Sequence, residues 1–97
     1  MPTYISLIKY TQQGINAIKD GPARLEANKE ILNRHGSQLK AFYLTMGRYD
    51  IIAIIEAPDD ATAAKIALTV GSAGHISTET LRAFTEDEFR EIVGGLP

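Results

Sequence analysis

The sequence contains no cysteine, no tryptophan and no long apolar run. The absence of cysteine excludes a disulfide framework, a thiolate nucleophile and a zinc site built on cysteine. The longest uninterrupted apolar segments, such as residues 51–55, are only a handful of residues long, whereas a membrane-spanning helix needs about 20. Residues 1–10 lack the cationic start and the small-residue cleavage site of a signal peptide. We therefore expect a cytoplasmic protein without a membrane partner.

The sequence also lacks a strong excess of charge of either sign. It contains 10 lysines and arginines and 12 aspartates and glutamates, which gives a net charge of −2. Half of the basic residues lie between residues 19 and 40, but Glu26 and Glu30 alternate with them, as on a solvated helix face. This balance argues against a nucleic-acid partner.

The length of 97 residues predicts one domain, residues 1–97, with one modest hydrophobic core. A chain of this size buries only about two-thirds of its unfolded surface, and such domains are often marginally stable alone. A partner subunit is therefore expected.

Hydrophobic spacing and turn residues predict the order β-α-β-β-α-β, followed by a short helix. The predicted strands are residues 4–10, 39–46, 51–57 and 76–84. The predicted helices are residues 22–35, a helix that begins at residues 58–60 and ends at Gly71 to Gly74, and a last helix from residue 85 to about residue 93. Asp59 or Asp60 is expected to cap the second helix, and Thr85 and Glu88 have the spacing of a capping box for the last one.

The first long helix is predicted to be amphipathic. Its sheet-facing stripe contains Pro22, Leu25, Lys29 and Leu32, and its opposite side, expected to face solvent, contains Arg24, Glu26, Asn28, Glu30 and Arg34.

This order predicts an α+β protein of ferredoxin-like plan, a four-stranded antiparallel sheet with both crossover helices on one face. If Gly47 and Arg48 form a two-residue loop, the helix-facing side of the hairpin contains Phe42, Leu44, Met46, Ile51, Ala53 and Ile55. The other side then contains Leu39, Ala41, Tyr43, Thr45, Asp50, Ile52, Ile54 and Glu56. An open face with this many apolar residues favours a homodimer in which two sheets pack together as a dimeric α/β barrel.

The last predicted strand is polar on one face and provides candidate ligand contacts. Thr78, Thr80 and Arg82 share a face, so they form either an ordinary strand, with Arg82 paired to Glu56 or Glu79, or a polar wall inside the barrel. In the second case Arg82 fixes an anionic ligand. Tyr4, Tyr10 and Tyr43 either line the same cavity or pack in the core and dimer interface.

The two histidines, His35 and His75, have no acidic or histidine neighbour at metal-ligand spacing, so no metal site is expected. His35 is interpreted as a helix-end residue. His75 is interpreted first as a turn residue and second as a general base or ligand contact. Residues 71–74 follow a helix instead of opening one and do not form a phosphate loop, and no cofactor is expected.

Three strings of the sequence together resemble the GYD domain family: residues 43–50, residues 56–60 and residues 77–84. The family is named for a Gly-Tyr-Asp hairpin, here Gly47, Tyr49 and Asp50. The resemblance implies a small dimeric α/β-barrel protein of bacteria or archaea and implies no activity. Ser77 stands where the resemblance leads us to expect arginine. For the hairpin residues we favour a turn-forming role over a catalytic one.

Three functions follow as hypotheses. The first is a homo-oligomer that binds a small molecule, such as an anion, at or near the sheet–sheet interface, with Arg82, His75, Thr78, Thr80 and Tyr43 as contacts. Its topology resembles the effector domains of Lrp/AsnC-type regulators. The second is a cofactor-independent enzyme similar to monooxygenases or isomerases of the dimeric α/β-barrel kind, with His75 as the candidate catalytic residue. The third is a structural assembly protein without a ligand.

Overall fold

A computed structural model describes all 97 residues. The strands are β1 (Thr3–Tyr10), β2 (Gln38–Leu44), β3 (Ile51–Glu56) and β4 (Ile76–Ala83). The helices are α1 (Gln12–Asn16), α2 (Gly21–Arg34), α3 (Asp60–Ser72) and α4 (Glu86–Gly94), and a 3-10 turn, Ile18–Asp20, precedes α2.

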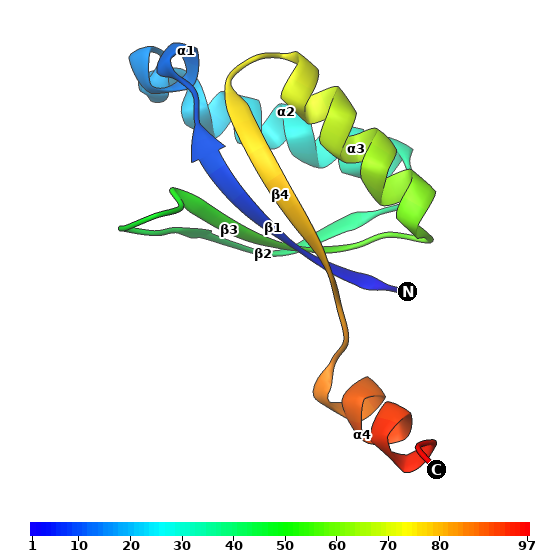
Figure 1. Cartoon of the computed structure of the whole chain (residues 1–97). Coiled ribbons are helices and arrows are strands. Elements are labelled where there is room, and N and C mark those ends of the chain that lie inside the picture. Colours follow the sequence, from blue (N-terminus) through cyan, green and yellow to red (C-terminus); the bar gives the residue numbers. More distant parts are fainter.

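The four strands form one antiparallel sheet in the order β2-β3-β1-β4. Figure 1 shows α2 and α3 together on one face of this sheet, while α4 extends away from it beyond the end of β4. This arrangement confirms the predicted α+β class and the ferredoxin-like strand order. None of the helices is both long and apolar enough to cross a membrane.

The β2–β3 hairpin has the register predicted from its glycine. Leu44 pairs with Ile51 and Tyr43 with Ile52, and Gly47 at the turn has a positive φ of 121°. Side chains alternate along paired strands, so Phe42 faces the helices and Tyr43 faces the opposite side. The prediction for Leu39 is wrong, because a bulge between Leu39 and Ala41 shifts the register and pairs Leu39 with Ile55 on the helix side.

The helix ends follow the expected capping chemistry. The Asp59 carboxylate accepts a hydrogen bond from the Thr62 N–H at 2.8 Å, and hydrogen bonding by the Thr62 side chain and by this N–H lowers the pKa of Asp59. At α4, the Glu88 carboxylate accepts from the Thr85 N–H at 2.8 Å, which lowers the pKa of Glu88, and the Thr85 hydroxyl accepts from the Glu88 N–H at 3.2 Å. This capping box shows that α4 begins at a well-formed end although nothing packs beside it.

The core lies between the sheet and its two covering helices. Tyr4, Ser6 and Ile8 of β1 alternate as buried residues toward the helices. Tyr4 packs with Ala57 and Ala63, where the small alanine side chain lets α3 approach the sheet. The other sheet face has no covering element and contains Ile5, Leu7, Tyr43, Ile52, Ile54 and Leu81. We call this surface the open face.

Tyr4 also links β1 to the start of α3. Its hydroxyl donates to Asp60 Oδ1 at 2.6 Å, and burial, together with this hydrogen bond to a carboxylate, raises the pKa of Tyr4 from 10.0 to about 12. The folded chain therefore keeps the tyrosine proton between these two values while the unfolded chain loses it. The stabilisation is fully present below pH 10.0 and is lost as the pH rises toward about 12.

We expect Tyr4→Phe to lower the free energy of unfolding by about 1 kcal/mol at neutral pH through loss of this hydrogen bond. The difference between the variant and the parent should shrink between about pH 10 and about pH 12. Urea unfolding of both proteins at several pH values measures this difference in the free energy of unfolding. Parallel curves for the two proteins across that range would contradict a raised tyrosine pKa.

Candidate functional site

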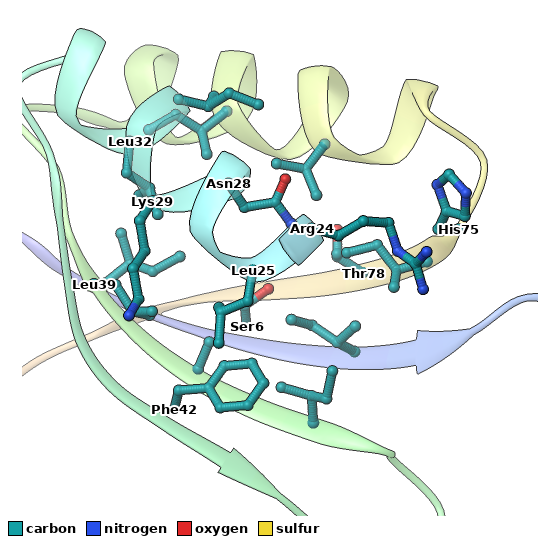
Figure 2. Close-up of a pocket in the computed structure, with 18 of the residues that line it drawn as sticks. Ser6, Arg24, Leu25, Asn28, Lys29, Leu32, Leu39, Phe42, His75 and Thr78 are labelled. Atoms are coloured by element: carbon teal, nitrogen blue, oxygen red, sulfur yellow. The ribbon is translucent and has the colours of Figure 1, made fainter. Parts of the chain in front are cut away.

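A cavity of about 540 Å³ lies between the sheet and the helices α2 and α3. Its volume is within the range of roughly 300–1,000 Å³ typical of small-ligand sites. Figure 2 shows Leu25 and Leu32 of α2 above it, Phe42 below it and Leu39 at one end. The walls are mainly apolar, because the alternating inward positions of β1, β2 and β3 supply isoleucine, phenylalanine, leucine and alanine.

A small set of polar side chains interrupts this apolar lining. Ser6 of β1 and Thr78 of β4 lie below the cavity, and Asn28 of α2 lies opposite them (Figure 2). Ser6 is only 5% exposed, and none of these three side chains makes a hydrogen bond within the chain. Their hydroxyl and amide groups are therefore available to a molecule in the cavity.

His75 lies at one end of the cavity, in the loop between α3 and β4. Its ring Nδ1 is buried and has no hydrogen-bond partner. Its backbone oxygen accepts from the Thr11 N–H at 3.1 Å, and the Thr11 hydroxyl donates to the Gly74 oxygen at 2.6 Å. The loop is thus fixed by its backbone, and one ring nitrogen stays without a hydrogen-bond partner.

The ionisable groups around the cavity favour negative charge inside it. The lining contains Arg24, Lys29 and His75, and no aspartate or glutamate. One Arg24 nitrogen, Nη2, donates to the Ala17 oxygen at 2.9 Å, which holds the guanidinium at the His75 end (Figure 2). Lys29 pairs with Glu26 at 3.2 Å, so Arg24 is the cation with donors to spare. In apolar surroundings an anion needs such a partner.

The five predicted ligand contacts do not lie together. Thr78, Thr80 and His75 line the cavity. They face α2 and α3 and not the open face on which a second sheet would pack. Tyr43 is on that open face and is 59% exposed.

Arg82 lies outside the cavity, near the end of β4. Its guanidinium stacks 4.4 Å from the Phe84 ring centroid and 5.7 Å from that of Tyr4, and it donates to the Ala83 and Thr3 carbonyl oxygens. The predicted pairing of Arg82 with Glu56 or Glu79 is wrong. Lys40 pairs with Glu56 at 3.9 Å and the Tyr49 hydroxyl donates to Glu79 at 3.4 Å.

Sequence reasoning missed Arg24 and Asn28, which it assigned to the solvent side of the first long helix. Both line the cavity, with Leu25 and Leu32. Arg24, Asn28 and Leu32 are spaced by four residues, so they form one helical stripe next to the predicted one. The four-residue spacing of this stripe is the sequence signal that could have placed Arg24 and Asn28 at the cavity. Because both residues are polar, the spacing was interpreted as a solvent-facing side.

The Gly-Tyr-Asp hairpin performs a structural task in this chain. The Asp50 carboxylate accepts from the Tyr10 N–H at 2.9 Å, and the Asp50 N–H donates to the Ile8 oxygen at 2.8 Å. These two hydrogen bonds fix the hairpin to β1. The Tyr49 ring lies under Lys9 Nζ at 5.5 Å and the Arg48 guanidinium at 5.8 Å.

The fold and the site define a ferredoxin-like α+β protein with a cavity between sheet and helices. The GYD domain matches residues 4–93, and the chain belongs to this family. It is 37% identical over 84 residues to the glutamine synthetase and cystathionine beta-lyase binding protein of Thermus thermophilus. That match covers 86% of this chain and 88% of the relative.

Two solved structures have a similar fold. The crystal structure of TTHA0845 from Thermus thermophilus has a TM-score of 0.56 at 24% identity, over 88% of this chain and 95% of that one. The feast or famine regulatory protein of M. tuberculosis, solved with L-methionine, has a TM-score of 0.63 at 16% identity, over 90% of this chain and 54% of that one. At these identities the likeness is one of fold alone.

Proposed function

We propose that this chain binds a small molecule with an apolar body and an anionic group in the cavity between the sheet and α2 and α3. The observation that carries the proposal is the charge of the lining: the Arg24 guanidinium lies at one end, and no carboxylate lines the cavity. The hydroxyls of Ser6 and Thr78 supply further hydrogen bonds. A relative named as a binding protein is consistent with a binding role.

The proposal moves the ligand from the sheet–sheet interface to the helix side of the sheet, because Thr78, Thr80 and His75 face that side. A homodimer remains part of it. The open face presents Ile52, Ile54 and Leu81 without a covering element, and two copies packed face to face would remove these side chains from water.

Two fluorescent probes of similar shape test the site without knowledge of the natural ligand. We expect 8-anilinonaphthalene-1-sulfonate, an aromatic anion, to bind at one probe per chain. Arg24→Gln should lower the affinity for this sulfonate at least 10-fold. The affinity for the uncharged N-phenyl-1-naphthylamine should change less than 3-fold, because only the anion loses a charge partner. Arg34→Gln, on the same helix but with its side chain 75% exposed, is the matched control.

Equal effects of Arg24→Gln and Arg34→Gln on the sulfonate would overturn the proposal. Mass spectrometry of the native protein from its own host then identifies the ligand, which we expect to be a small organic anion at one copy per chain.

A second candidate function is the binding of a metabolic enzyme. The observation that favours it is the name of the Thermus thermophilus relative, which is described as binding glutamine synthetase and cystathionine beta-lyase. Sedimentation of this protein with purified glutamine synthetase from the same host tests it, and co-sedimentation is the expected result. The enzyme and assembly-protein hypotheses stay predictions.

A further inference from the structure

The helix α4 presents an apolar stripe that nothing in the chain covers. Phe89, Ile92 and Val93 have the i, i+3, i+4 spacing of one helix face, and Leu96 follows just after the helix ends at Gly94. Their exposed fractions are 60%, 49%, 46% and 65%. The capping box at Thr85 and Glu88 fixes the start of this helix, so the stripe is a preformed surface.

The position of α4 indicates what covers it. Figure 1 shows α4 on the side of the sheet away from α2 and α3, beyond the end of β4. A second sheet stacked on the open face would lie alongside it. Leu81 is on the open face and is 44% exposed. It belongs to β4, the strand that precedes α4, so the apolar surface of the sheet extends in the direction of the helix.

A twofold arrangement treats both copies alike. Each copy gives one helix and receives another, so the exchange would cover the apolar stripe of α4 in both protomers.

The net charge of α4, with four carboxylates and one arginine in residues 86–94, favours a basic end of the second copy. The polar side of α4 contains Asp87, Glu88 and Glu91, with Arg90 paired to Glu86 at 2.6 Å. Lys9 shares the open face, at the end of β1 that lies beside Arg48 and Tyr49. Because α4 leaves β4 near Thr3, a twofold axis across the strands places it beside the Lys9 and Arg48 end of the partner.

We propose that α4 is an exchanged element, which docks its apolar stripe on a second copy of this chain beside the hairpin of that copy. The inference rests on the homodimer in the proposed function. It adds that the C-terminal helix of one protomer docks beside the hairpin of the other, at its Lys9 and Arg48 end. Each protomer therefore contributes both a helix and a docking surface to the same interface.

Sedimentation equilibrium of the 97-residue chain tests the exchange. The double variant Phe89→Ser with Ile92→Ser should raise the dissociation constant of the dimer at least 10-fold, without loss of stability in the monomer, since both side chains are exposed there. The control Glu86→Ser with Arg90→Ser removes a surface pair of the same helix and should change the constant less than 3-fold.

The absence of cysteine permits a direct test of the contact. A chain with Ile92→Cys mixed with a chain with Arg48→Cys should form a mixed disulfide on oxidation. A chain with Lys65→Cys, on the exposed side of α3, should not form one with the first.

The outcomes separate this inference from the proposals on which it rests. A dimer unaffected by the Phe89 and Ile92 variant, with no mixed disulfide, overturns the exchange and leaves the sheet dimer standing. A monomeric parent chain overturns both. If the variant stays dimeric but no longer binds glutamine synthetase, α4 is an enzyme-docking surface and the exchange is overturned. The sulfonate probe reports on the cavity in every case.

Discussion

Gly14→Ala should lower the free energy of unfolding by about 3 kcal/mol, the upper range for a forced overlap in a packed interior. Gly14 is buried in α1, and a Cβ at this position would lie well inside 3.0 Å of the His75 backbone oxygen. That oxygen cannot rotate away, because it belongs to the main chain and accepts the Thr11 N–H at 3.1 Å. The variant must therefore shift the loop and break the hydrogen bond, and urea unfolding measures the loss.

Gly71→Ala is the matched control for this substitution. Gly71 lies inside α3, and a Cβ there would meet nothing within 4 Å. Alanine is the better helix former by about 1 kcal/mol, so the control should stabilise the protein by up to that amount. Equal effects of the two substitutions would contradict the close approach of α1 to the loop before β4. Because that loop contains His75, Gly14→Ala should also lower the affinity for the sulfonate probe.

The alternation of a strand is visible in the sequence, and this explains which parts of the fold and site could be predicted. The register around Gly47 and the shared face of Thr78 and Thr80 both follow from period-two patterning once the turn is placed. The bulge after Leu39 has no such signal in the sequence, so the prediction of the sheet face on which Leu39 lies is wrong. The contact between Gly14 and His75 joins residues distant in sequence, and no local pattern reports it.

The helices show the same division between local and distant information. Capping at Asp59 and Thr85 depends on neighbouring residues and was predicted. Which side of α2 faces the sheet depends on how the helix packs over it. The sequence offers two adjacent stripes for that side, the predicted one and the one that contains Arg24 and Asn28. The polar character of Arg24 and Asn28 favoured the wrong choice, because a cavity, unlike a packed core, accepts polar side chains that a ligand can satisfy.

Ser6→Leu should have opposite effects on stability and binding. Ser6 is 5% exposed on β1 and its side chain faces the cavity. Leucine would fill part of the space and remove an unpartnered hydroxyl, so the free energy of unfolding should rise by about 1–2 kcal/mol. The same side chain occupies the volume a ligand needs, and the affinity for both naphthalene probes should fall at least 10-fold.

Ser6→Ala separates the two contributions, since it removes the hydroxyl without filling the cavity. We expect it to keep the affinity for N-phenyl-1-naphthylamine within 3-fold of the parent. A tightly packed interior would instead make Ser6→Leu destabilising by about 1–3 kcal/mol through overpacking. A gain in stability coupled to a loss of binding is therefore the signature of a real cavity. A loss of stability with Ser6→Leu would mean that α2 closes on the sheet in solution and leaves no site there.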